Sequence, residues 1–90
     1  MTGKQVRVKY ISLLRGINVG GHRKIRMADL KVMYEGLGYR DVVTYIQSGN
    51  VVFTAAAQDT DGMAAALEKE IAQQLGEWVP VMVSNPQKNV

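Results

Sequence analysis

Two apolar patterns alternate along the chain and predict its secondary structure. Residues 6–14 form a short run rich in β-branched side chains that stops before Gly16, as expected of a strand. Residues 27–37 instead repeat apolar side chains at helical spacing and are followed by Gly38, a residue type common just beyond a helix end. The first forty residues therefore predict a strand, a loop over residues 15–26, and a helix.

The rest of the chain continues with a hairpin, a helix and a strand. Residues 41–46 and 50–54 are β-branched or aromatic runs joined by a short turn that contains glycine, which predicts two antiparallel strands. Residues 62–75 carry an apolar side chain at every fourth position, which predicts a second helix. Residues 79–83 predict a last strand, and the proline at position 80 places that strand at a sheet edge.

The resulting order of strands and helices predicts an α+β fold, the ferredoxin-like βαββαβ sandwich. Its four-stranded antiparallel sheet has the strand order 4-1-3-2, with two helices on one face. We expect residues 1–84 to form this single domain and residues 85–90 to form a polar tail. A chain of 90 residues has room for one hydrophobic core.

Composition narrows the chemistry. The chain has no cysteine and one histidine, His22, which argues against disulfides, thiolate metal sites and most histidine metal centres. No Ser, His and Asp arrangement matches a nucleophile motif, so we predict no catalytic residue, no metal and no cofactor. The sequence pattern shows neither a leader peptide nor an apolar segment long enough to span a membrane. We therefore expect a cytoplasmic protein that does not bind a membrane.

Charge is distributed unevenly. Residues 1–40 hold nine Lys and Arg against two acids, whereas residues 41–90 hold two against six. This asymmetry indicates either an anionic partner for the first half or pairing between two halves of the fold.

The basic loop is the strongest candidate for a binding site. In the predicted topology the first two strands run in the same direction, so this loop and the hairpin turn share one end of the sheet. Amide groups at a helix start and basic side chains favour a small polar or anionic ligand there. The candidate ligand-binding residues are Arg15, Asn18, Gly20, Gly21, Lys24, Arg26, Gln47, Ser48 and Asn50. The same residue types also build ordinary crossover loops, and that structural interpretation stays open.

Two stretches carry a resemblance to a known family. LLRGINVGG at residues 13–21 and YIQSGNVVF at residues 45–53 closely resemble the signatures of the bacterial family called domain of unknown function 1697, and KIRMADL at residues 24–30 is similar to it as well. The resemblance covers residues 10–83. It implies the fold but no activity, because the family has none assigned. Members of that family resemble a longer chain, so we expect this one to be the N-terminal portion.

Nucleic-acid binding is an alternative function. RNA-recognition domains of this fold stack bases on aromatic side chains of the sheet, and Tyr10, Tyr45 and Phe53 lie on predicted strands. Against this alternative, the strand that contains Phe53 lacks the Arg/Lys-Gly-aromatic pattern of those domains.

Self-association is a further alternative. The first strand has apolar residues in both phases, with Val8 and Tyr10 in one and Ile11 and Leu13 in the other. Because the helices cover one sheet face only, the second apolar face needs another cover. We therefore expect a homo-oligomer through the open sheet face, or a structural domain of a longer two-domain protein.

Overall fold

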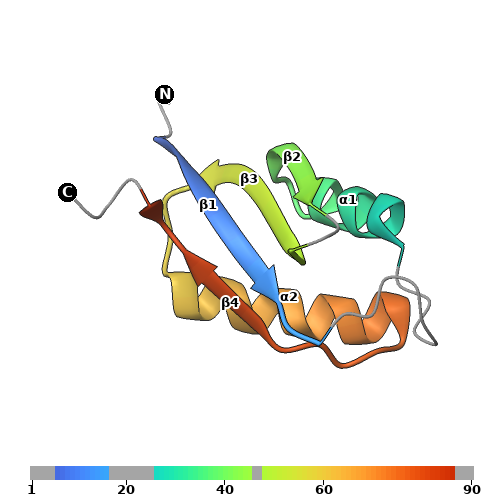
Figure 1. Ribbon diagram of the computed structural model, residues 1–90. Helices are drawn as coiled ribbons and strands as arrows, with labels where there is room; N and C mark the ends of the chain where they lie inside the picture. Colours follow the sequence, from blue (N-terminus) through green and yellow to red (C-terminus); the bar gives the residue numbers. More distant parts are fainter. Residues whose placement is uncertain (1–5, 17–25, 46–47, 87–90) are drawn as a thin grey trace.

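A computed structural model describes residues 6–16, 26–45 and 48–86 of the chain. The elements are β1 (Arg7–Leu14), α1 (Met27–Gly36), β2 (Arg40–Tyr45), β3 (Asn50–Ala56), α2 (Thr60–Leu75) and β4 (Val81–Ser84). Their order confirms the predicted βαββαβ succession (Figure 1).

The four strands form one antiparallel sheet in the order β2-β3-β1-β4, which is the predicted order 4-1-3-2 read from the other edge. In the centre, Leu13 of β1 pairs with Asn50 of β3 on one side and with Met82 of β4 on the other. Since β3 is antiparallel to both β1 and β2, these two strands run in the same direction. The end of β1 therefore lies beside the β2–β3 turn.

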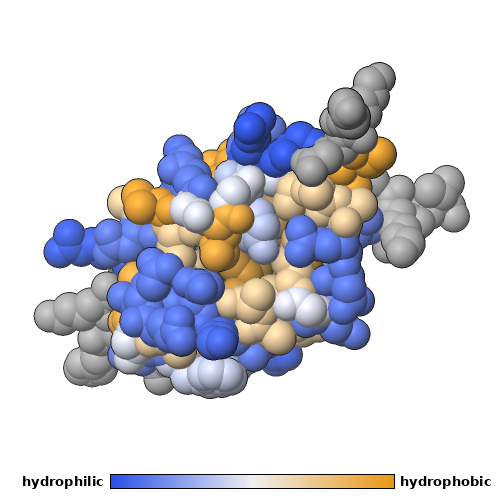
Figure 2. Space-filling model, turned by 180° about the vertical axis from the view of Figure 1, so that it is seen from behind, coloured by the Kyte–Doolittle hydropathy of each residue, from blue (hydrophilic) through white to orange (hydrophobic). Residues whose placement is uncertain are grey.

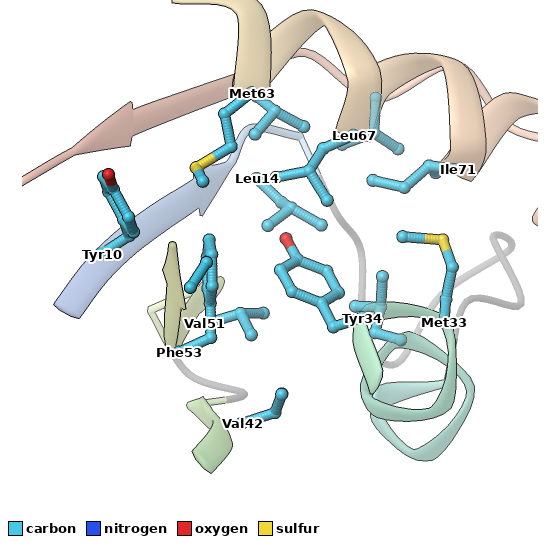
Figure 3. Close-up of a cluster of buried hydrophobic side chains, with 14 residues drawn as sticks. Tyr10, Leu14, Met33, Tyr34, Val42, Val51, Phe53, Met63, Leu67 and Ile71 are labelled. Carbon is cyan, nitrogen blue, oxygen red and sulfur yellow. The ribbon is translucent and has the colours of Figure 1, made fainter. Parts of the chain in front are cut away.

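Both helices pack on one face of the sheet, and β1 and β4 pass in front of α2 in Figure 1. Burial along β3 alternates, with Val51, Phe53 and Ala55 buried and the residues between them partly exposed, as in a strand covered on one face. The same face of the sheet meets three buried residues of α2 at four-residue spacing (Figure 3), namely Met63, Leu67 and Ile71.

Aromatic rings fill the space between the sheet and α1. The Phe53 ring lies at the centre of this group, stacked on Tyr39 with ring centroids 4.6 Å apart and on Tyr10 at 5.8 Å. Tyr34 of α1 approaches Phe53 edge-on at 5.3 Å. Offset and edge-to-face contacts of this kind add to the energy of burial and fix α1 over the sheet.

The second helix starts two residues earlier than the apolar pattern predicts. Asp59 precedes it, and its carboxylate accepts a hydrogen bond from the backbone N–H of Gly62 at 2.8 Å. This cap satisfies a donor of the first turn, so the polar residues Thr60 and Asp61 join the helix. The predicted end is confirmed, since Gly76 adopts a left-handed conformation with φ 74°.

The last strand also differs from its predicted bounds. It begins at Val81, so Pro80 precedes the strand instead of lying inside it, because proline has no N–H to donate to a ladder. The predicted edge position is correct, and Pro86 follows the strand closely. At the opposite edge, the pairing of β2 with β3 is irregular between Arg40 and Val43, where Asp41 has φ 53°.

Candidate functional site

Three chain segments meet at the C-terminal end of β1. The Leu14 N–H donates to the carbonyl of Gly49 in the β2–β3 turn at 2.9 Å, and the Arg15 N–H donates to the carbonyl of Pro80 at 3.0 Å. The end of β1, from which the first loop leaves, thus lies beside the hairpin turn, whereas residues 17–25 of that loop lie outside the described residues. The connection between α2 and β4 is the third segment at this end of the sheet, and the sequence did not predict its position there.

The structure describes four of the nine predicted ligand-binding residues. Arg15 Nη1 lies 3.9 Å from the Met82 sulfur, and the Asn50 side-chain amide donates to the Ser48 hydroxyl at 2.9 Å. Arg26 precedes α1 and makes no side-chain capping hydrogen bond to it. Five candidates, Asn18, Gly20, Gly21, Lys24 and Gln47, lie outside the described residues. The anion site at these loops therefore stays a prediction.

The sheet face that carries no helix has a group of neighbouring apolar side chains, which we call the apolar stripe. Its members are Ile11, Leu13, Val43, Tyr45, Val52 and Met82. Pairing aligns them in two rows across the sheet, since Val43 lies opposite Val52 and Val52 opposite Ile11, while Leu13 lies opposite Met82. Tyr45 is 51% exposed and Met82 56% exposed, although both are large apolar side chains.

One end of the apolar stripe is hollowed. A cavity of about 250 Å³ opens there between β1, β3 and β4, lined by Ile11, Leu13, Asn50, Met82, Val83 and Ser84. This volume lies below the range of roughly 300–1,000 Å³ that is usual for small-molecule sites.

Cations flank the apolar stripe. The four strands carry Arg7, Lys9 and Arg40, and Arg15 follows β1 directly, whereas Asp41 is the one acid on these strands. All five of these side chains are exposed. The sheet therefore presents a basic rim around an apolar centre.

The helix layer has the opposite charge balance. The two helices together hold five acids, Asp29, Glu35, Asp61, Glu68 and Glu70, against two lysines, Lys31 and Lys69. Figure 2 shows this side of the molecule, where hydrophilic residues lie beside hydrophobic ones. The charge asymmetry along the sequence thus becomes a difference between the two faces of the fold.

The aromatic residues proposed to stack bases do not lie on one face. Tyr10 is 1% exposed and Phe53 fully buried, because both point toward the helices. The Tyr10 hydroxyl is also bound, since it accepts from the Gln58 N–H at 3.0 Å. Of the three predicted aromatic residues, only Tyr45 is on the open face, so the predicted base-stacking platform is wrong.

Among the described residues, the tyrosines with an altered pKa lie in the core or pack against it. Burial raises the pKa of the Tyr34 phenol far above its ordinary value. Burial also raises the pKa of Tyr39. Within the described ranges no group of three His, Cys, Asp or Glu side chains is placed to hold a metal ion, and no helix is long and apolar enough to cross a membrane. His22 lies outside these ranges.

Comparisons with known proteins match this chain over most of its length. The sequence model of the family described as "Protein of unknown function (DUF1697)" matches residues 8–89. A solved structure, that of the conserved bacterial protein SP0830 from Streptococcus pneumoniae, is similar with a TM-score of 0.75 and 32% sequence identity. The match covers 91% of this chain and 45% of that one, so this chain spans about half the length of that relative. Comparison with curated proteins gave no significant match.

Proposed function

This chain belongs to the DUF1697 family of proteins of unknown function, and we propose that it is a binding domain whose open sheet face packs against a second folded protein unit. The observation that carries this proposal is the apolar stripe, which is exposed although the chain has two helices that cover the other face. Burying apolar surface releases roughly 25 cal/mol for each Å² removed from water. A partner that covers this face and buries the apolar stripe therefore gains free energy from the contact.

The shape of the face favours a protein over a small molecule as its ligand. The apolar stripe extends from Val43 on β2 to Met82 on β4, across all four strands of the sheet. The cavity at its end is smaller than an ordinary ligand site. An apolar centre with a polar rim is the usual form of a protein interface.

Replacing Leu13 by Asp tests the proposal, because it places a charge in the middle of the apolar stripe. At about 1 M salt the Debye length is about 3 Å, so charge repulsion is screened and the apolar face is free to pair with any similar face, including that of another copy. We expect the wild-type domain to form concentration-dependent dimers in this buffer by sedimentation equilibrium, and Leu13→Asp to remain monomeric.

Val32→Asp is the matched control, since Val32 is 67% exposed on α1 and lies outside the open face. It should dimerise like the wild type. Met82→Asp provides a second stripe variant whose side chain is more exposed than that of Leu13, and it should behave like Leu13→Asp. A wild-type protein that stays monomeric in high salt, or a Val32→Asp protein that loses association equally, would contradict the proposal.

A further inference from the structure

We infer that the partner of the open face presents apolar side chains surrounded by carboxylates, and that it is a different protein surface, not a second copy of this chain. The inference rests on the proposed function and adds the chemistry of the partner to it. Its basis is the charge around the apolar stripe, where four cations face one carboxylate among the described residues of the strands and the position after β1.

A second copy placed face to face brings like charges together. Asp41 offers little compensation, because its single negative charge balances only one of the cations. At physiological salt the Debye length is about 8 Å, so charges across one interface still interact. Like-charge contacts of this kind raise the free energy of the wrong complex and so select against it.

The helix layer of a second copy is also a poor cover. Its carboxylates match the basic rim, but among the described residues its large exposed apolar side chains are Val32 on α1 and Trp78 after α2, with none on α2 itself. The exposed positions of α2 are Asp61, Gly62, Ala65, Ala66, Lys69, Gln73 and Gln74. Stacking sheet on helix layer would moreover join unlike surfaces, which generates rings or open chains of molecules instead of a closed dimer.

Arg15 and the cavity together define the contact that the partner makes. The Arg15 guanidinium lies 3.9 Å from the sulfur of Met82, which lines the cavity. An apolar partner side chain in the cavity therefore places a neighbouring carboxylate beside Arg15. Arginine binds carboxylates through two parallel N–H bonds, which orients the partner as well as attracting it.

A charge-reversed copy of this chain supplies a probe with the inferred chemistry. The triple variant Arg7→Glu/Arg15→Glu/Arg40→Glu keeps the apolar stripe but leaves one cation against four carboxylates around it. At about 0.01 M salt, where the Debye length is about 30 Å, we expect this variant to bind the wild-type chain at least about tenfold more tightly than either protein binds itself. Isothermal titration calorimetry measures the mixture, and sedimentation equilibrium measures each protein alone.

The control variant Lys31→Glu/Lys69→Glu reverses the charge of both lysines of α1 and α2, and it should not bind the wild type more tightly than wild type binds itself. Leu13→Asp in the wild-type partner should abolish the complex with the charge-reversed copy. Wild-type self-association as tight as the mixture would overturn the inference but leave the proposed function standing, with a second copy as the partner. A complex that survives Leu13→Asp, or no complex at all, would overturn both.

Discussion

Ser12 and Tyr34 form a polar contact inside an otherwise apolar core. Their oxygens are 2.8 Å apart, and the Ser12 hydroxyl also donates to the Val51 carbonyl at 3.1 Å. Since a serine hydroxyl has one proton, the Tyr34 phenol is the donor toward Ser12. Both side chains are fully buried, so this bond ties α1 to the central strand at one defined position.

Removing Ser12 should cost more stability than removing the Tyr34 hydroxyl. Ser12→Ala leaves the phenol as a buried donor without an acceptor, which costs about 1–3 kcal/mol. Tyr34→Phe leaves Ser12 still bonded to Val51, so we expect a loss of about 1 kcal/mol. Urea unfolding of both single variants and of the double variant measures these losses. Equal losses, or strict additivity in the double variant, would show that the two side chains do not act as a pair.

The raised pKa of Tyr34 predicts a stability loss in alkali. In the folded protein the phenol keeps its proton above the ordinary pKa of 10.0, whereas the unfolded chain releases it. This contribution to stability is complete below pH 10 and declines as the pH rises above it, because only the unfolded state gains from ionisation. The urea midpoint of the wild type should therefore fall more steeply above about pH 10 than that of Tyr34→Phe. Parallel curves for the two proteins would contradict this assignment.

At the level of elements, the β2–β3 turn is fixed to β1 by close backbone contact. Gly49 has φ 70°, and a Cβ added there would lie 3.0 Å from the carbonyl oxygen of Leu14. Glycine is required at this position for two reasons, the left-handed backbone and the missing side chain. Its own carbonyl accepts from the Leu14 N–H, so the turn and the end of β1 move together.

Gly49→Ala should destabilise the domain more than Gly16→Ala. Gly16 also has a positive φ, 76°, but a Cβ there meets nothing within 4 Å. Gly16→Ala therefore carries the conformational cost of about 1–2 kcal/mol, and Gly49→Ala adds the clash to it. Chemical denaturation midpoints of the two variants measure the difference. If Gly16→Ala proved as destabilising as Gly49→Ala, the close approach to Leu14 would not matter.

The sequence predicted these elements well but not which strand phase faces the helices. Residues 7–14 have apolar side chains in both phases, so the pattern fits either orientation. The aromatic group settles the choice in the fold, because Tyr10 packs on Phe53 beneath the helices and leaves Ile11 and Leu13 outside. The base-stacking hypothesis failed at this step, since it required Tyr10 and Phe53 on the open face.

For the molecule as a whole, the two faces of the sheet differ in two ways: helices cover only one of them, and the charges on the two sides are opposite. The charge asymmetry was visible in the sequence, but its meaning depends on strand phase and on which side the helices occupy. The prediction of an uncovered apolar face was correct for Ile11 and Leu13. The role of Pro80 at the end of β1 was not predictable, because that contact joins residues 65 positions apart with no motif to indicate it.

The two edges of the sheet limit how this protein aggregates. β4 is only four residues long, with Pro80 before it and Pro86 shortly after it, and the pairing of β2 is irregular near Asp41. Neither edge therefore offers a long regular row of free N–H and C=O groups. Strand-by-strand templating, the step by which cross-β fibrils grow, requires such a row. An uncovered apolar sheet normally carries the risk of seeding fibrils. In this fold the exposed apolar surface lies on the open face of the sheet and not at its edges. Association through that face therefore favours finite complexes over fibre growth.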